Sequence, residues 1–211
     1  MERSASHSSA VWPERQLGEA SGFNTGERKS WKRPRSEKIV EAYAHYIMGW
    51  FTIPNIKCRG QYEIDLLAVD VFKKGCVHRY HIESGISISG AYSLLTNKPF
   101  SVQDLKTRVK KAGQRRTLEY FTTRKFGAIE VVDKLREYGF EPGNYTKVIV
   151  SWGWCDDVPA AAKNAGVELW CFQDILQKIA DRCRSDRTYF TDDTMRTLQL
   201  MAKVTSKGSL D

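Results

Sequence analysis

The chain lacks several motifs that mark common protein functions. Its five cysteines include no Cys-x-x-Cys pair, so neither zinc-finger spacing nor a disulfide framework is indicated. It contains no Gly-x-x-x-x-Gly-Lys-Ser/Thr loop, no Gly-x-Gly-x-x-Gly and no Gly-x-Ser-x-Gly sequence. Nucleotide hydrolysis and serine-esterase chemistry therefore have no support.

Long apolar runs are also absent. No segment approaches the roughly 20 apolar residues that a membrane helix needs. The N-terminus has no apolar stretch of the kind found in a secretory signal. An odd number of cysteines without paired spacing is typical of reduced thiols in a cytosolic protein. We therefore expect a cytoplasmic protein without a membrane partner.

The overall composition predicts one globular domain with tails. The 211 residues are 41% hydrophobic and 27% charged, as in ordinary globular proteins. Residues 1–35 are rich in Ser, Gly and charge, so we expect a basic, mostly disordered arm. A domain at 36–182 and a helical extension at 183–211 would follow. Trp31 lies among cations in the arm, either as a stacking residue of a phosphate-contacting segment or as the anchor of a solvated tail.

Two apolar segments carry the first functional signal. Residues 61–70 and 77–89 have the Ile, Val, Leu and Tyr content of strands, and a Lys/Gly turn separates them. Asp65 and Glu83 lie within these segments. A carboxylate half-buried in a sheet is costly unless a cation or a hydrogen-bond donor lies beside it. Two such acids on adjacent strands therefore suggest a divalent metal site.

Helices and strands alternate along the rest of the chain. Apolar residues at helical spacing predict a helix before the hairpin, with Glu41 at the border of its buried face. After the hairpin, a strand, a short helix, a strand and a helix predict a parallel pair of strands. The predicted segments are helices at 36–50, 128–138 and 156–166, and strands at 51–58, 147–152 and 167–172.

Two histidines, His78 and His81, precede Glu83 in the second apolar segment. Because they are three residues apart, they point to opposite faces of a regular strand and are poor candidates for ligands of one metal. We interpret each as a surface histidine or as a histidine with its hydrogen bonds satisfied.

Positive charge is concentrated between residues 98 and 125. This stretch holds nine Lys and Arg residues against two acids, a local net charge of +7, whereas the whole chain has +8. Such a cluster on one or two helices favours contact with a nucleic-acid backbone over an ordinary solvated helix face. The predicted nucleic-acid-binding residues are Lys106, Arg108, Lys110, Lys111, Arg115 and Arg116.

The hairpin with its two acids resembles that of the PD-(D/E)XK nuclease superfamily, and the end of the domain resembles Mrr-type and Holliday-resolvase-like members. The sequence Glu63-Ile64-Asp65-Leu66-Leu67-Ala68 matches the first family strand, and Glu83-Ser84-Gly85 matches part of the second. The resemblance implies an α/β, restriction-endonuclease-like core, a central mixed sheet flanked by helices. It also implies Mg²⁺ or Mn²⁺ held by Asp65, Glu83 and Glu41, with Gln114 as a further catalytic residue.

Gly85 stands where the family places a lysine. Three explanations are open. Another residue could substitute for the lysine, with Gln114, Lys106 and Lys110 as the candidates. The domain could instead only bind nucleic acid. Finally, the strand register could differ, with Ser84 or Ser87 in the pocket.

These features predict a metal-dependent nuclease that hydrolyses phosphodiester bonds in DNA. The family implies a context of restriction, phage defence or repair. The alternative is a catalytically inactive nuclease-like module that binds nucleic acid or a protein partner. The paired acids favour the nuclease, whereas the missing lysine favours the inactive module. Either form could act as a homodimer or within a larger defence or repair assembly.

Overall fold

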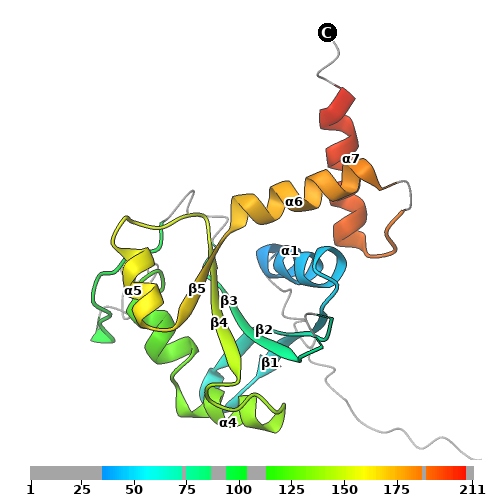
Figure 1. The fold of residues 1–211 in the computed structure, drawn as a ribbon. Coiled ribbons are helices and arrows are strands. Elements are labelled where there is room, and N and C mark those ends of the chain that lie inside the picture. Colours follow the sequence, from blue (N-terminus) through cyan, green and yellow to red (C-terminus); the bar gives the residue numbers. More distant parts are fainter. Residues whose placement is uncertain (1–34, 73–74, 87–93, 104–112, 187–188, 208–211) are drawn as a thin grey trace, which may run out of the picture. The chain divides into compact units, whose positions relative to one another are not determined.

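A five-stranded mixed sheet forms the centre of the described part of the chain, in the order β1-β2-β3-β4-β5. The first three strands are antiparallel neighbours, whereas β3, β4 and β5 run parallel to one another (Figure 1). Their bounds are β1 Phe51–Lys57, β2 Glu63–Asp70, β3 His78–Ser84, β4 Tyr145–Ser151 and β5 Val167–Cys171. The predicted α/β class, the mixed sheet and the parallel pairing of the last two strands are thus confirmed.

The computed structural model describes residues 35–72, 75–86, 94–103, 113–186 and 189–207. All of them belong to one compact unit, Arg33–Asp211. Residues 1–34 of the predicted arm lie outside the described residues, and so do Lys106, Arg108, Lys110 and Lys111 of the predicted nucleic-acid-binding set.

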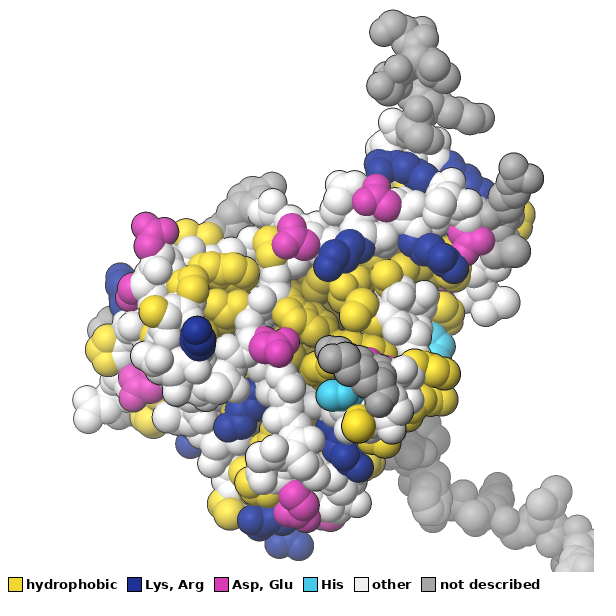
Figure 2. Space-filling view, in the orientation of Figure 1, with side chains coloured by type: hydrophobic (Ala, Val, Ile, Leu, Met, Phe, Trp, Pro, Cys, Tyr) yellow, Lys and Arg dark blue, Asp and Glu magenta, His cyan; other side chains and the backbone are white. Residues whose placement is uncertain are grey.

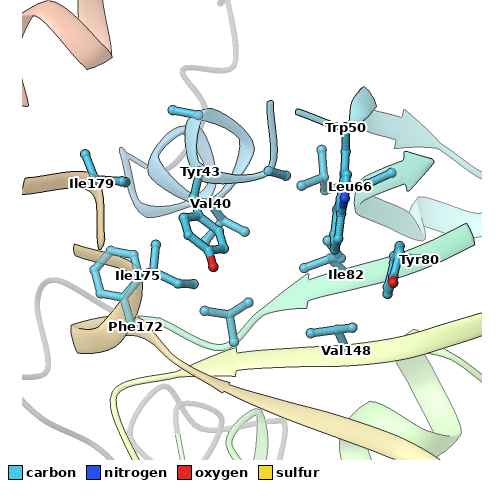
Figure 3. Close-up of a cluster of buried hydrophobic side chains, with 14 of the residues drawn as sticks. Val40, Tyr43, Trp50, Leu66, Tyr80, Ile82, Val148, Phe172, Ile175 and Ile179 are labelled. Atoms are coloured by element: carbon cyan, nitrogen blue, oxygen red, sulfur yellow. The ribbon is translucent and has the colours of Figure 1, made fainter. Parts of the chain in front are cut away.

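Helices α1 and α6 and the π-helical turn η1 cover one face of the sheet, and helix α7 packs against α6 and α1. Their bounds are α1 Arg35–Ala42, η1 Tyr43–Ile47, α6 Phe172–Ser185 and α7 Asp193–Lys207. Between these helices and the strands, Val40 and Ile175 pack with Leu66, Ile82 and Val148 in one buried cluster (Figure 3). Hydrophobic side chains also gather on the surface between α6 and the strands (Figure 2).

The opposite face carries shorter helices. These are α3 Leu118–Tyr120, the π-helical turn η4 Phe121–Lys125, α4 Ile129–Glu137 and α5 Val158–Asn164. Phe121 and Phe126 pack with Ile149 of β4, and Leu135 of α4 packs with Leu67 of β2. Helices therefore flank the sheet on both faces, as the sequence predicts, and none of the described helices is long and apolar enough to cross a membrane.

Strand β1 lies at one edge of the sheet and pairs only with β2 among the described strands. Its Pro54 has no backbone N–H to donate, which suits an edge position. A short 3₁₀ turn, η2 Arg59–Gln61, then returns the chain into β2. The helix predicted at 36–50 is confirmed over its first part, but it widens into η1 and ends at Ile47.

The C-terminal helix α7 shares the core of the sheet. Met195 is fully buried and Ala202 is 5% exposed, and both belong to the cluster that contains the α1 and α6 side chains. Helix α7 lies within the helical extension expected at 183–211. Residues 189–207 therefore contribute buried apolar surface to the same unit as the strands.

We predict that Met195→Ala lowers the free energy of unfolding by about 2–5 kcal/mol, because it leaves a cavity in this core. Met201→Ala on the same helix is the matched control, since Met201 is 62% exposed. That control should change stability by no more than about 0.5 kcal/mol. Urea unfolding of both variants checks this, and equal effects would mean that α7 does not share the core.

Candidate active site

The two acids predicted to act together do lie side by side. Leu66 of β2 pairs with Ile82 of β3, and the next step of this register brings Asp65 beside Glu83. The backbone N–H of Asp65 donates to Glu83 Oε1 at 3.4 Å, and that of Ser84 donates to Asp65 Oδ2 at 2.8 Å. Asp65 is 8% exposed and Glu83 is fully buried. Each carboxylate thus has one oxygen fixed by hydrogen bonds.

The other oxygen of each acid meets the ammonium of Lys125. Lys125 Nζ lies 3.0 Å from Asp65 Oδ1 and 2.5 Å from Glu83 Oε2. It also donates to the backbone carbonyl of Glu63 at 3.3 Å. The two acids therefore share a cation that the chain itself supplies. Sequence reasoning counts Lys125 only as one charge of the basic stretch and misses this role.

Lys125 reaches the acids from the π-helical turn η4. The N–H of Phe126 donates to the carbonyl of Phe121 at 2.8 Å, five residues back, so the turn is wider than an α-helical one. Both phenylalanines are buried. At Gly127 a Cβ atom would lie 2.5 Å from the carbonyl oxygen of Thr122, so only glycine can follow the turn without a shift. Such π-turns are frequent at functional sites.

The same turn leaves little room for a side chain at Gly85. Its backbone N–H donates to the Val150 carbonyl at 2.8 Å. A Cβ atom at Gly85 would lie 3.1 Å from Phe121 Cζ, so a side chain there would force Phe121 to move by a few tenths of an ångström. Phe121 packs where a lysine at position 85 would begin, and the lysine that meets the acids comes from η4 instead.

A pocket of about 290 Å³ opens beside the three charged groups. It includes Ser84, one of the serines considered for an altered register, whereas Ser87 lies outside the described residues. Two predicted nucleic-acid-binding residues, Arg115 and Arg116, also line it. The lining consists of Glu37, Asp65, Ser84, Gly85, Ile86, Arg115, Arg116, Tyr120, Phe121 and Lys125.

Two predicted site residues are not among the described residues that line this pocket. Glu41 is half-buried on α1, whereas Glu37, one turn earlier on the same helix, lines the pocket. The side-chain oxygen of Gln114 accepts a hydrogen bond from the backbone N–H of Ser101 at 2.8 Å. The helical spacing of Glu37 and Glu41 was the signal available in the sequence, and it does not tell which turn reaches the site.

Burial raises the pKa of both acids, the charge of Glu83 adds to the rise at Asp65, and Lys125 opposes it. Burial, together with Glu83, raises the pKa of Asp65 to about 6, although Lys125 and the Ser84 N–H counteract the rise. Burial also raises the pKa of Glu83, again against Lys125. Burial alone would lower the pKa of Lys125, but Glu83 and Asp65 outweigh it and hold that pKa above its ordinary value. The lysine therefore stays protonated.

Burial and the neighbouring acids together shift the pKa of Glu37. Burial, followed by the charges of Asp65 and Glu63, raises the pKa of Glu37 to about 8, and Lys125 only partly offsets them. At Glu37, the ammonium of Lys125 thus does not cancel the effect of the neighbouring acids.

The oxygens of the site suit a hard divalent cation in their chemistry. Among the residues that the structure describes, no three His, Cys, Asp or Glu side chains are grouped to hold a metal ion. Mg²⁺, however, is commonly held by only one or two carboxylates and completes its shell with waters and substrate phosphates. Asp65 Oδ1 and Glu83 Oε2 are the two carboxylate oxygens that meet the Lys125 ammonium.

Comparisons of the chain with protein-family models, with curated proteins and with solved structures find no match.

We predict that Gly127→Ala lowers the free energy of unfolding by about 1–3 kcal/mol, because its methyl group would press on the Thr122 carbonyl and distort η4. Gly113→Ala is the control, since a Cβ atom there meets nothing within 4 Å. Chemical denaturation of both variants checks the difference. A Gly127→Ala variant as stable as the Gly113→Ala variant would contradict the tight turn.

A second prediction concerns pH. The pKa of Glu37 is near 4.5 in the unfolded chain and about 8 in the folded chain, so the unfolded chain loses this proton first as pH rises. Its contribution to stability therefore falls between about pH 4.5 and pH 8. Glu37→Gln should reduce this fall by about 1 kcal/mol, a figure discounted for solvent screening.

Denaturation curves at pH 5 and pH 8 measure this change. Glu41→Gln, one turn further along α1, is the matched control because Glu41 is outside the described lining of the pocket. If the dependence of stability on pH is the same in Glu37→Gln as in the wild type, the surroundings of Glu37 do not raise its pKa.

Proposed function

We propose that the protein is a metal-dependent nuclease that hydrolyses phosphodiester bonds, with DNA as substrate. The observation that carries this proposal is the buried group of Asp65, Glu83 and Lys125, in which two acids on adjacent strands share one cation. Lys125 supplies the charged group that Gly85 cannot. The paired acids together with a lysine are what the PD-(D/E)XK resemblance implies for an active site.

The arrangement of the chain supports a restriction-endonuclease-like core. A helix precedes the hairpin of β2 and β3, both acids lie on that hairpin, and helices flank the mixed sheet. We assign the role of the helical acid to Glu37 instead of Glu41, since Glu37 lines the pocket. Because Lys125 can fill the role of the family lysine, Gln114 is not needed for it.

In this proposal, Asp65 and Glu83 would hold Mg²⁺ or Mn²⁺. When bound, such an ion lowers the pKa of its water and neutralises charge that develops on the phosphate. Lys125 remains protonated beside both acids, so its ammonium can orient the attacking water or stabilise charge in the transition state. Arg115 and Arg116, which line the same pocket, can bind phosphate oxygens through their guanidinium groups.

One observation favours the alternative of an inactive module that binds nucleic acid or a protein partner. Lys125 already pairs with both acids, so the cluster is partly balanced without any metal. Restriction, phage defence or repair, and a homodimer or a larger assembly, remain expectations of the resemblance.

We predict that Asp65→Ala, Glu83→Ala and Lys125→Met each lower plasmid cleavage in Mg²⁺ or Mn²⁺ by at least about 100-fold, because each removes a group that acts on the transition state. Lys163→Met is the control for a lost lysine charge, since Lys163 is exposed on α5 and lies outside the described lining of this pocket. Circular dichroism confirms that each variant is folded, and Lys125→Arg keeps the charge if Lys125→Met is unstable.

Cleavage that survives both Asp65→Ala and Glu83→Ala would exclude this site. Salt-sensitive DNA binding by the wild type without any cleavage would favour the inactive module. The double variant Lys125→Met with Gly85→Lys asks whether a lysine at the family position can replace Lys125. We expect no recovery, because Phe121 occupies the space next to position 85.

A further inference from the structure

The ring of His81 lies directly behind Glu83. Both residues are on β3, two positions apart, so their side chains point to the same face of the sheet. His81 Nε2 is 2.7 Å from Glu83 Oε1, and both side chains are fully buried. Phe126 meets the imidazole edge-on, with ring centroids 4.8 Å apart. The residue that follows Lys125 therefore holds the histidine in place.

The imidazole is the donor in this hydrogen bond. Glu83 Oε2 meets the ammonium of Lys125, so the carboxylate is ionised and can only accept. We assign the proton to Nε2 on this basis. Nδ1 then has no hydrogen-bond partner among the described residues.

This bond decides which oxygen of Glu83 is left for a cation. Oε1 accepts from His81 Nε2 and from the Asp65 N–H, whereas Oε2 meets only the ammonium in the contacts described above. A carboxylate held at one oxygen by two donors cannot turn freely about its last torsion. On the basis of the proposed function, we infer that His81 is a positioning residue that fixes Glu83 so that Oε2 is presented to the divalent cation.

A purely structural role does not explain the imidazole. Burying a ring nitrogen without a hydrogen-bond partner is destabilising, and Nδ1 is such an atom among the described residues. An apolar side chain would fill the same space without this cost. What the imidazole adds is the donor at Nε2, and that donor acts on Glu83 alone.

The test is Mn²⁺ affinity, measured by electron paramagnetic resonance on the full chain. His81→Leu should weaken Mn²⁺ binding by about 10- to 100-fold, the usual loss when a hydrogen bond to a metal ligand is removed. His81→Gln should restore affinity to within a few-fold, because its amide N–H can replace Nε2–H. His78→Leu is the matched control on the same strand and should bind like the wild type.

The outcomes separate the two proposals. If the wild type binds no Mn²⁺, the proposed nuclease function fails, whatever His81 does. If the wild type binds Mn²⁺ and folded His81→Leu binds it equally well, the positioning role is overturned. Should His81→Leu not fold, nitrogen-15 NMR of the wild type decides. The His81 ring should carry its proton on Nε2, and its Nε2 signal should shift as Mg²⁺ is added. A proton on Nδ1, or an Nε2 signal unmoved at saturating Mg²⁺, would overturn the inference.

Discussion

The ion group of Asp65, Glu83 and Lys125 is the interaction on which the site depends. Its acids are nearly or fully buried, and Lys125 is only 19% exposed, so three charges are largely removed from water. Desolvation of charges costs several kcal/mol per ion, and an apolar replacement of a buried ion pair is often neutral or stabilising. The group is therefore poor evidence for a stabilising role. A functional site that needs fixed charges explains this ion group better than a stabilising role does.

Three separate parts of the fold bring these charges together. The register of β2 with β3 places the acids side by side. The wide turn η4, closed by Gly127, brings Lys125 over them. Helix α1 then adds Glu37 to the pocket. Phe121 and Phe126 connect these parts, because they pack the turn onto the sheet beside Gly85 and His81.

The sequence was sufficient for features that depend on local pattern. Alternation in strands and a short hairpin turn place Asp65 near Glu83, and the apolar periods give the strands and most of the helices. Lys125 could not be found in this way, because it is far from Glu83 in the chain and its reach depends on a π-turn that no propensity rule marks. The same alternation could have paired His81 with Glu83, since the two are two residues apart. The spacing of His81 from His78 carries no such information, because the two histidines point to opposite faces of the strand.

The acidity of the pocket bears on the choice between catalysis and simple binding. A module that only binds nucleic acid should present net positive charge, because phosphate is repelled by nearby carboxylates. Here burial, followed by the charges of Asp65 and Glu63, raises the pKa of Glu37 to about 8, and Lys125 only partly offsets these acids. A divalent cation would balance these acids and attract phosphate to the same point. Arg115 and Arg116 line the pocket, where they could meet the phosphate from another side. Carboxylates hinder simple binding of phosphate, but they suit a metal-assisted reaction. This contrast is the strongest physical reason to prefer hydrolysis.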